Sequence, residues 1–325
     1  KIIPAALAMV LILLATAALQ AQERRRSLGP YTMYEQIVYQ AKQERLMTWL
    51  SHDMNHGRAT GTRDAARVAR YIETHFRQYG LEPFCAGSFY QPFLADSASG
   101  TVGRNVIGFV PSAVPSDEYV LITAHYDHLG VLDGNIYNGA DDNASGVTVL
   151  LNLADMFGTM KKTRTGPDKN IIFAALDAKE LNMAGSKALV GRLQEREMTD
   201  SILCAINIDQ IGTVIEPVHE ADTSFVIVLG EQTLRRQDRG LIDMCNRYYN
   251  IGLDIDHTFY GSENFTRLFY QLSDQIVFHE AGIPALVFTS GFHRHTYKTT
   301  DDPDIISYPV MKKRTLLIFY LTMML

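Results

Sequence analysis

The residues of this 325-residue chain with the greatest potential for chemistry lie at positions 124–146, AHYDHLGVLDGNIYNGADDNASG. This stretch holds two histidines, four aspartates and four glycines between apolar runs. Imidazole and carboxylate groups at this density are typical ligands of divalent cations. The pattern therefore predicts a polar loop that binds a cation.

The flanking segments indicate how that loop is positioned. Residues 119–123 (YVLIT) form a continuous apolar, β-branched run, which is typical of a strand buried on both faces of a parallel sheet. Apolar residues recur at helical spacing over residues 147–157, so a helix is expected to begin near Ser145 or Gly146. The loop then leaves the carboxyl end of a central strand ahead of a helix, which is where open α/β sheets usually place their sites.

Three further apolar runs, at residues 170–176, 201–208 and 284–289, are predicted as core strands, and each is followed by polar groups. These groups are Asp177 and Glu180, then Asp209, and then His293 and His295. Many carboxylates in one crevice repel each other unless a cation neutralises them. A mixed set of histidines and carboxylates without thiolates suits zinc in an open catalytic site. The alternative is that each acid only caps a helix or a turn.

The order of the predicted elements indicates an α/β fold. Strands alternate with helices, which favours a three-layer α/β/α sandwich with a mixed, mostly parallel central sheet. Residues 64–79 are predicted as a helix with Asp64 as its cap and Gly80 as its stop. The segment 83–103 is rich in Pro, Ser, Gly and Ala, and a short strand follows at 105–110. Residues 225–229 are a further strand, 233–249 a polar-faced helix, and a closing helix runs from Pro309 onward.

Composition excludes some classes of protein. The chain is 46% hydrophobic and 20% charged with a net charge of −6, which is ordinary for a globular domain. Lysines and arginines do not cluster with aromatic residues, so nucleic acid is not an expected partner. Three scattered cysteines are too few for a disulfide framework or a cysteine zinc site.

The N-terminal sequence predicts export. Lys1 is followed by an apolar run over residues 2–18 and by small residues ahead of a cut after Ala21, so residues 1–21 read as a secretory signal peptide. Residues 22–325 would then form a single catalytic domain, secreted or periplasmic, with no stable membrane span after removal of the signal. The alternative is a membrane anchor, because the run approaches the roughly 18 residues that a spanning helix needs. The alanines in the run and the three arginines that follow it favour cleavage.

Five motifs resemble those of the co-catalytic zinc exopeptidases. They are H-x-D at 125–127, G-A-D-D-N-A-S-G at 139–146, D-A-x-E at 177–180, I-N-x-D at 206–209 and E-A-G-I-P at 280–284. The family includes secreted bacterial leucyl aminopeptidases, glutamate carboxypeptidases and the catalytically silent transferrin receptors. The resemblance runs in order from about residue 105 to residue 303.

The resemblance implies a ligand set for two zinc ions, or one. His125 and Asp209 would hold one ion, Glu180 and a late histidine the other, and Asp141 would bridge both. Asp127 would orient the imidazole of His125 and raise its basicity. A water activated by the metal would attack the peptide substrate, while the metal polarises the scissile carbonyl.

Two positions depart from the family pattern. The family has two consecutive glutamates, the first acting as general base, and here that first position is Lys179. A protonated lysine cannot accept a proton, and loss of a general base typically costs about 10²- to 10⁴-fold in rate. The family's last zinc histidine aligns without a gap on Tyr297, whereas His295 fits only with two inserted residues, and His293 is a third candidate. His295 is the predicted ligand, because tyrosine is a poor zinc ligand at neutral pH.

The sequence therefore predicts a zinc-dependent exopeptidase, specifically an aminopeptidase. One alternative is a catalytically inactive pseudo-peptidase that binds peptides or partners, which the loss at Lys179 would permit. Another is a single-zinc enzyme similar to glutaminyl cyclases, whose Asp, Glu and His ligands could be Asp141, Glu180 and a late histidine. Retention of both His125 and Asp209 favours two metals.

Overall fold

The structure, a computed structural model, describes residues 29–219 and 223–325. The predicted signal peptide and the predicted domain start at residue 22 lie outside these residues. The chain divides into two compact units, residues 1–37 and 38–325. The described part of the first unit is the 3₁₀ helix η1 (Gly29–Ile37). Among the described residues, no helix combines the length and the hydropathy that crossing a membrane requires.

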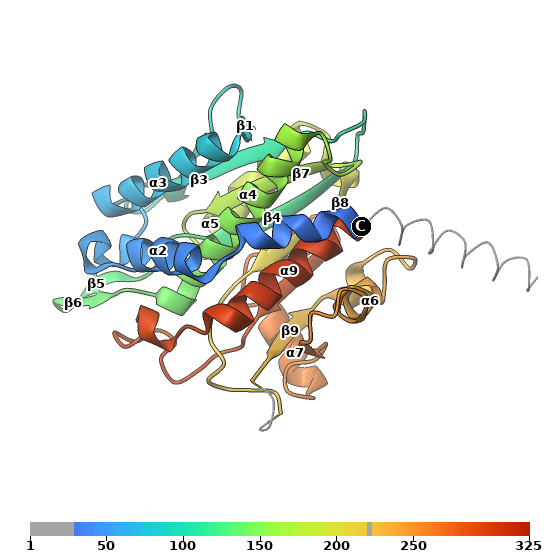
Figure 1. The fold of residues 1–325 in the computed structure, drawn as a ribbon. Helices are drawn as coiled ribbons and strands as arrows, with labels where there is room; N and C mark the ends of the chain where they lie inside the picture. The colour runs from blue at the N-terminus through green and yellow to red at the C-terminus, as the bar shows by residue number, and fades with distance from the viewer. Residues whose placement is uncertain (1–28, 220–222) are drawn as a thin grey trace, which may run out of the picture. The chain divides into compact units, whose positions relative to one another are not determined.

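The second unit is built on a nine-stranded mixed sheet (Figure 1). The strand order is β1-β3-β7-β4-β8-β11-β9-β10, with β2 paired to β3. The strands are β1 (Glu82–Pro83), β2 (Tyr90–Asp96), β3 (Thr101–Val110), β4 (Tyr119–His125), β7 (Asn170–Leu176), β8 (Ile202–Ile208), β9 (Phe225–Leu229), β10 (Asp254–Asp256) and β11 (Ala285–Thr289). The central strands β7, β4, β8 and β11 are parallel, while β3 and β9 run antiparallel to their neighbours β7 and β11. A two-stranded hairpin, β5 (Gly130–Leu132) and β6 (Asn135–Tyr137), stands apart from this sheet.

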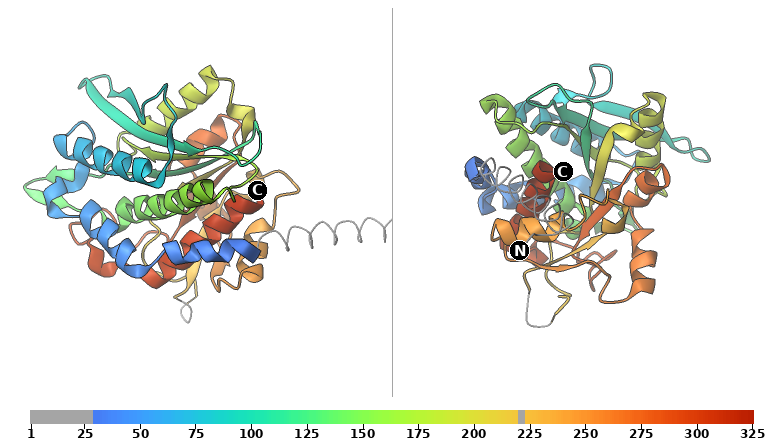
Figure 2. Two further views of the ribbon diagram at one scale, coloured as in Figure 1. Left: turned by 45° about the horizontal axis from the view of Figure 1, so that its top comes forward. Right: turned by 90° about the vertical axis from the view of Figure 1, so that its right-hand side faces the viewer.

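Helices cover both faces of the sheet, which confirms the predicted three-layer α/β/α sandwich (Figure 2). Helices α2 (Gln40–Leu50), α3 (Arg63–Tyr79), α4 (Gly146–Thr163) and α9 (Tyr308–Met324) pack together on one face, and α5 (Ala184–Glu195) and α8 (Gln275–Glu280) pack together on the other. Helix α6 (Leu241–Tyr248) contacts α9. The remaining α-helix of the described residues is α7 (Glu263–Tyr270). Short 3₁₀ or irregular turns are η2 (Asp53–Arg58), η3 (Ala140–Ser145), η4 (Thr199–Ser201), η5 (Glu231–Thr233) and η6 (Pro303–Ile305).

The central strands form where the sequence predicts them, because their side chains are apolar on both faces. Every residue of β7 and β8 is buried, as is β4 after its first residue. In the register of β4 and β7, His125 lies opposite Leu176, so the two strands end at the same level. Residues that leave the carboxyl ends of these parallel strands therefore meet at one edge of the sheet.

Three local predictions differ from the structure. The cap of α3 is Thr62, whose hydroxyl accepts the N–H of Ala65, rather than Asp64. The helix predicted over residues 233–249 is reduced to α6, because Gly240 adopts a positive φ of 84°, a conformation that interrupts a helix. The strand predicted at 105–110 begins at Thr101, since pairing with β2 extends it.

Candidate metal centre

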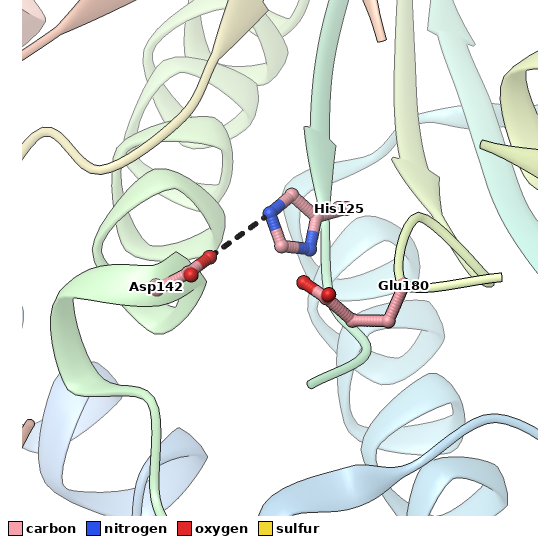
Figure 3. Close-up of side chains that lie close together, drawn as sticks. All are labelled: His125, Asp142 and Glu180. Carbon is pink, nitrogen blue, oxygen red and sulfur yellow. Dashed lines mark ion pairs between the residues drawn. The ribbon is translucent and has the colours of Figure 1, made fainter. Parts of the chain in front are cut away.

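Three potential metal ligands converge at the carboxyl edge of the sheet. They are His125 at the end of β4, Asp142 in η3, and Glu180 in the loop after β7, and their ligand atoms all lie within 4.8 Å of one another. The carboxylates of Asp142 and Glu180 both face the ring of His125 (Figure 3). His125 and Asp142 are fully buried, and the Glu180 side chain is 19% exposed.

Asp209, which follows β8, completes a set suited to one divalent ion. The Nε2 atom of His125 lies 3.3 Å from Oδ1 of Asp142 and 3.4 Å from Oδ1 of Asp209. Zinc with ligands about 2.1 Å away in a tetrahedron separates its ligand atoms by roughly 3.4 Å. Both carboxylate oxygens of Asp142 are buried, and no described residue hydrogen-bonds to them. The donor types, and the spacing of each carboxylate from His125, therefore fit zinc at this position.

The electrostatics of the site follow from this crowding. Burial by itself would lower the pKa of His125, but the carboxylate of Asp209 contributes to raising it well above its usual value. Burial would raise the pKa of Asp142, yet the charge of Lys179 and the contact with His125 hold it far below its usual value. Burial raises the pKa of Glu180 to about 7, against the opposing effect of Lys179. A site of this kind binds a cation by exchanging protons for metal.

Asp127 lies against the imidazole of His125, and against the effect of burial its side chain contributes to raising the pKa of that imidazole, as predicted. The Nδ1 atom of His125 lies 3.1 Å from the backbone carbonyl oxygen of Asp127 and 3.7 Å from its carboxylate. The carboxylate also accepts the backbone N–H groups of Lys179, at 3.0 Å, and of Glu180, at 3.1 Å. The backbone carbonyl of Asp127 therefore orients the imidazole of His125. Its carboxylate positions the loop that carries Lys179 and Glu180.

The structure does not bring Asp141, the predicted bridge, into this group. Its carboxylate accepts the N–H of Gly212 at 2.6 Å and lies 3.0 Å from Nε2 of His293. The hydroxyl of Ser290 donates to it at 3.4 Å. The adjacent side chains of Asp141 and Asp142 in the irregular turn η3 point to different partners. The metal-ligand role that the sequence predicted for Asp141 therefore falls one residue later. Asp142 takes the place that the resemblance gave to Asp141.

Two buried residues fix the turn that carries Asp142. The carboxylate of Asp301 accepts the N–H groups of Asp141, at 2.8 Å, and of Asp142, at 3.0 Å. The guanidinium of Arg58 donates to the backbone carbonyls of Tyr126, Asn138, Gly139 and Asp142. Burial lowers the pKa of Arg58 to about 10 and raises that of Asp301 to about 7, the latter with help from the charge of Asp141. Sequence reasoning missed Arg58, because its partners are backbone atoms that leave no motif.

Replacing Arg58 by methionine should destabilise the protein by at least about 3 kcal/mol. The substitution leaves several buried carbonyls without a donor, and each such group costs roughly 1–3 kcal/mol. Urea unfolding measures the loss, and Arg58→Lys should show an intermediate effect because it keeps the charge but fewer donors. The exposed Arg63 offers a control, since Arg63→Met should change stability by less than about 0.5 kcal/mol. Equal losses for the two methionine variants would contradict this role.

His295, the predicted last ligand, is directed away from the site. Its Nδ1 atom lies 2.8 Å from the Thr300 hydroxyl, and its Nε2 atom accepts from Arg294 at 3.1 Å. His293 is already bound to Asp141. Tyr297 reaches the centre instead, with its hydroxyl 3.1 Å from Nζ of Lys179. The structure therefore agrees with the alignment without a gap, in which Tyr297 takes the position of the family's last zinc histidine. We do not assign His295 as a ligand.

Lys179 lies inside the centre as a cation. Its Nζ atom is 3.1 Å from Oε1 of Glu180, and the residue is 8% exposed. Burial would lower the pKa of Lys179, but the charges of Asp142 and Asp209 hold it well above its usual value. Burial and the charge of Asp142 raise the pKa of Tyr297 to about 12, so its phenol is neutral. Neither side chain can accept a proton from water at neutral pH.

Asp177 does not belong to the centre, although it follows the same strand as Glu180. Its carboxylate accepts from the Thr60 hydroxyl, the Tyr126 hydroxyl and the N–H of Arg104. Burial, followed by the charge of Asp127, raises its pKa to about 6. The residue therefore ties β4 and β7 to their neighbours.

An apolar pocket opens beside the centre. Lys179, Asp209 and Ser273 lie on its wall, and the rest is mostly apolar, formed by Leu229, Phe259, Phe269, Leu272, Val287 and Phe292. Its empty volume, open solvent included, is about 410 Å³. These side chains come from segments far apart in the sequence, which explains why no local pattern predicted the pocket. The arrangement can hold an apolar side chain next to a bound metal.

The comparisons with known proteins agree with this geometry. The model of peptidase family M28 matches residues 105–322. The aminopeptidase YwaD of Bacillus subtilis is 30% identical over 190 residues, which cover 58% of this chain and 36% of that protein. The aminopeptidase NAALADL1 of Rattus norvegicus is 34% identical over 128 residues, 37% of this chain and 16% of that protein. The matched region thus spans about a third or less of these two relatives.

Solved structures share the fold at low identity. A zinc aminopeptidase from Bacillus subtilis superposes with a TM-score of 0.64 at 17% identity, covering 86% of this chain and 93% of the other. A glutaminyl cyclase from Fimbriiglobus ruber gives a TM-score of 0.71 at 16% identity, covering 89% and 96%. Since the family match covers more than half of the chain and includes every candidate ligand, the chain belongs to peptidase family M28.

Proposed function

We propose that this protein is a zinc-dependent aminopeptidase that removes apolar residues from the N-termini of peptides. The observation that carries the proposal is that His125, Asp142 and Glu180 bring their ligand atoms within 4.8 Å of one another. Asp209 lies 3.4 Å from the same imidazole and on the wall of an apolar pocket. Asp209 thus belongs to both the candidate ligands and the pocket, which supports a substrate side chain bound beside the metal ligands. Membership of a peptidase family that includes aminopeptidases supports the same reaction.

The chain's own residues have separable tasks in this proposal. Zinc held by His125, Asp142 and Asp209 would lower the pKa of a bound water and polarise the scissile carbonyl. The apolar pocket would bind the side chain of the first residue and exclude water from it. Because Lys179 cannot act as general base, we expect turnover about 10²- to 10⁴-fold below that of a site with a glutamate there.

The test is hydrolysis of aminoacyl p-nitroanilides by zinc-loaded protein. Leucyl and phenylalanyl substrates should exceed aspartyl and lysyl substrates in kcat/KM by at least about 10-fold, since burying a larger apolar group in a pocket is worth that much. His125→Ala should lower kcat/KM by more than about 100-fold, because it removes a zinc ligand. His279→Ala, an exposed histidine on α8, is the matched control and should leave hydrolysis unchanged. Absence of hydrolysis that depends on His125 would refute the proposal.

A second candidate is a catalytically silent peptide-binding protein. The observation that favours it is the ion pair of Lys179 with Glu180, which fills the position of the family's general base. Zinc-loaded protein would then bind a leucyl peptide in calorimetry without releasing leucine.

The single-zinc glutaminyl cyclase alternative lacks one of its ligands. It requires a late histidine near Glu180, and both His293 and His295 contact other groups. The likeness to the solved glutaminyl cyclase concerns the fold.

A further inference from the structure

The ammonium of Lys179 occupies the part of the centre that the family resemblance assigns to a second zinc ion. Its Nζ atom lies 3.1 Å from Oε1 of Glu180 and 3.1 Å from the hydroxyl of Tyr297. Glu180 and the position of Tyr297 are the two places from which the family takes its second set of ligands. The lysine side chain is 6% exposed, so the ammonium lies among the carboxylates rather than in solvent.

Contacts with neighbouring residues hold the Lys179 side chain in its orientation toward Glu180 and Tyr297. Its backbone N–H donates to Asp127 at 3.0 Å, and the same carboxylate accepts the N–H of Glu180. The ring centroid of Tyr297 lies 5.5 Å from Nζ, a cation–π distance. The ring of Tyr297 in turn stacks parallel to buried His128, with centroids 6.3 Å apart and 7° between planes. The hydrogen bond of its own backbone and the contacts with Tyr297 thus hold the Lys179 ammonium inside the centre.

The residues present do not fit a second zinc ion. A phenol is protonated at neutral pH and has replaced the imidazole. His293 and His295, the two nearby histidines in the sequence, are engaged with Asp141 and with Thr300. A second ion would have only Glu180 and one oxygen of Asp142, fewer than the three or four protein ligands of ordinary zinc sites. A second zinc ion would also lie next to the Lys179 ammonium, which already forms an ion pair with Glu180.

We infer that this protein binds a single zinc ion, at His125, Asp142 and Asp209, and that the Lys179 ammonium takes the place of the second ion. The inference rests on the proposed zinc site and goes beyond it, because it sets the stoichiometry and gives Lys179 a role. The centre keeps the charge balance of a cluster with two cations while only one of them is a metal. Tyr297 then acts as the partner of the ammonium rather than as a metal ligand.

Zinc stoichiometry tests the inference directly. Purified chain stripped with a chelator and dialysed against Zn²⁺ should retain one equivalent by elemental analysis, and Co²⁺ titration should reach its visible-absorption endpoint at one equivalent. Two tightly held equivalents would overturn the single-ion inference while leaving the proposed zinc site intact. Zero equivalents would overturn the proposed zinc site itself, and with it the inference.

A double variant tests whether Lys179 and Tyr297 are what excludes the second ion. Lys179→Glu combined with Tyr297→His should bind two equivalents, with the second at least about 100-fold tighter than any second binding by the wild-type chain. Lys187→Glu, an equal charge change at an exposed position of α5, should stay at one equivalent. Circular dichroism establishes that each variant is folded. A folded double variant that still binds one equivalent would show that Lys179 does not hold the second position.

Discussion

Substituting glutamate for Lys179 should raise kcat on leucyl p-nitroanilide by at least about 100-fold in the zinc-loaded protein. The position already lies inside the centre, and its backbone N–H is held by Asp127 whatever the side chain. A carboxylate there can take the proton from a metal-activated water, and a general base contributes roughly 10²- to 10⁴-fold. The rate should also gain an acidic limb in its pH profile, because the new base must be deprotonated to act.

Two further variants separate a gained base from a lost charge. Lys179→Met removes the ammonium without supplying a base, so it should leave kcat within about 10-fold of the wild-type value. Lys187→Glu changes the net charge equally on the exposed face of α5 and should have no effect. If the methionine variant gained as much as the glutamate variant, repulsion by the ammonium, rather than the missing base, would be what limits the rate.

Exchanging the two adjacent aspartates for asparagine should affect zinc binding very differently. Asp142→Asn keeps the shape of a side chain whose oxygens have no hydrogen-bond partner among the described residues, but it removes the charge that faces His125. Loss of outer groups around a metal typically costs about 10- to 100-fold in affinity, so loss of a ligand should weaken zinc binding by more than about 100-fold. Competition with a chromophoric chelator at constant pH measures the dissociation constant.

Asp141→Asn should instead act mainly on stability. The asparagine oxygen can still accept the N–H of Gly212, but the ion pair with His293 is lost. We expect zinc affinity to change by less than about 10-fold and stability to fall by about 1–3 kcal/mol, as for other buried hydrogen-bonded groups that lose a partner. The reverse order of zinc affinities for the two variants would restore Asp141 as the bridging residue.

The core strands, and the edge of the sheet where the chemistry lies, could be predicted from the amino-acid sequence. Strands β4, β7 and β8 are continuous apolar runs, which are typical of strands buried on both faces of a parallel sheet. The carboxyl ends of parallel strands share one edge, so the convergence of His125, Glu180 and Asp209 followed from their positions after these runs. The motif resemblance also led to the family, which the comparison confirmed.

Which of the neighbouring side chains face the centre depends on the three-dimensional fold and could not be predicted from the sequence. Asp141 and Asp142 are identical in chemistry, and the direction of each depends on a turn held by Arg58 and Asp301 through backbone groups. The choice of Tyr297 over His295 likewise depends on how the last loop closes against Lys179. The apolar pocket joins strands and helices that are distant in sequence. Periodicity and spacing record local burial and the order of elements, whereas the direction of a side chain in an irregular turn is set by long-range contacts.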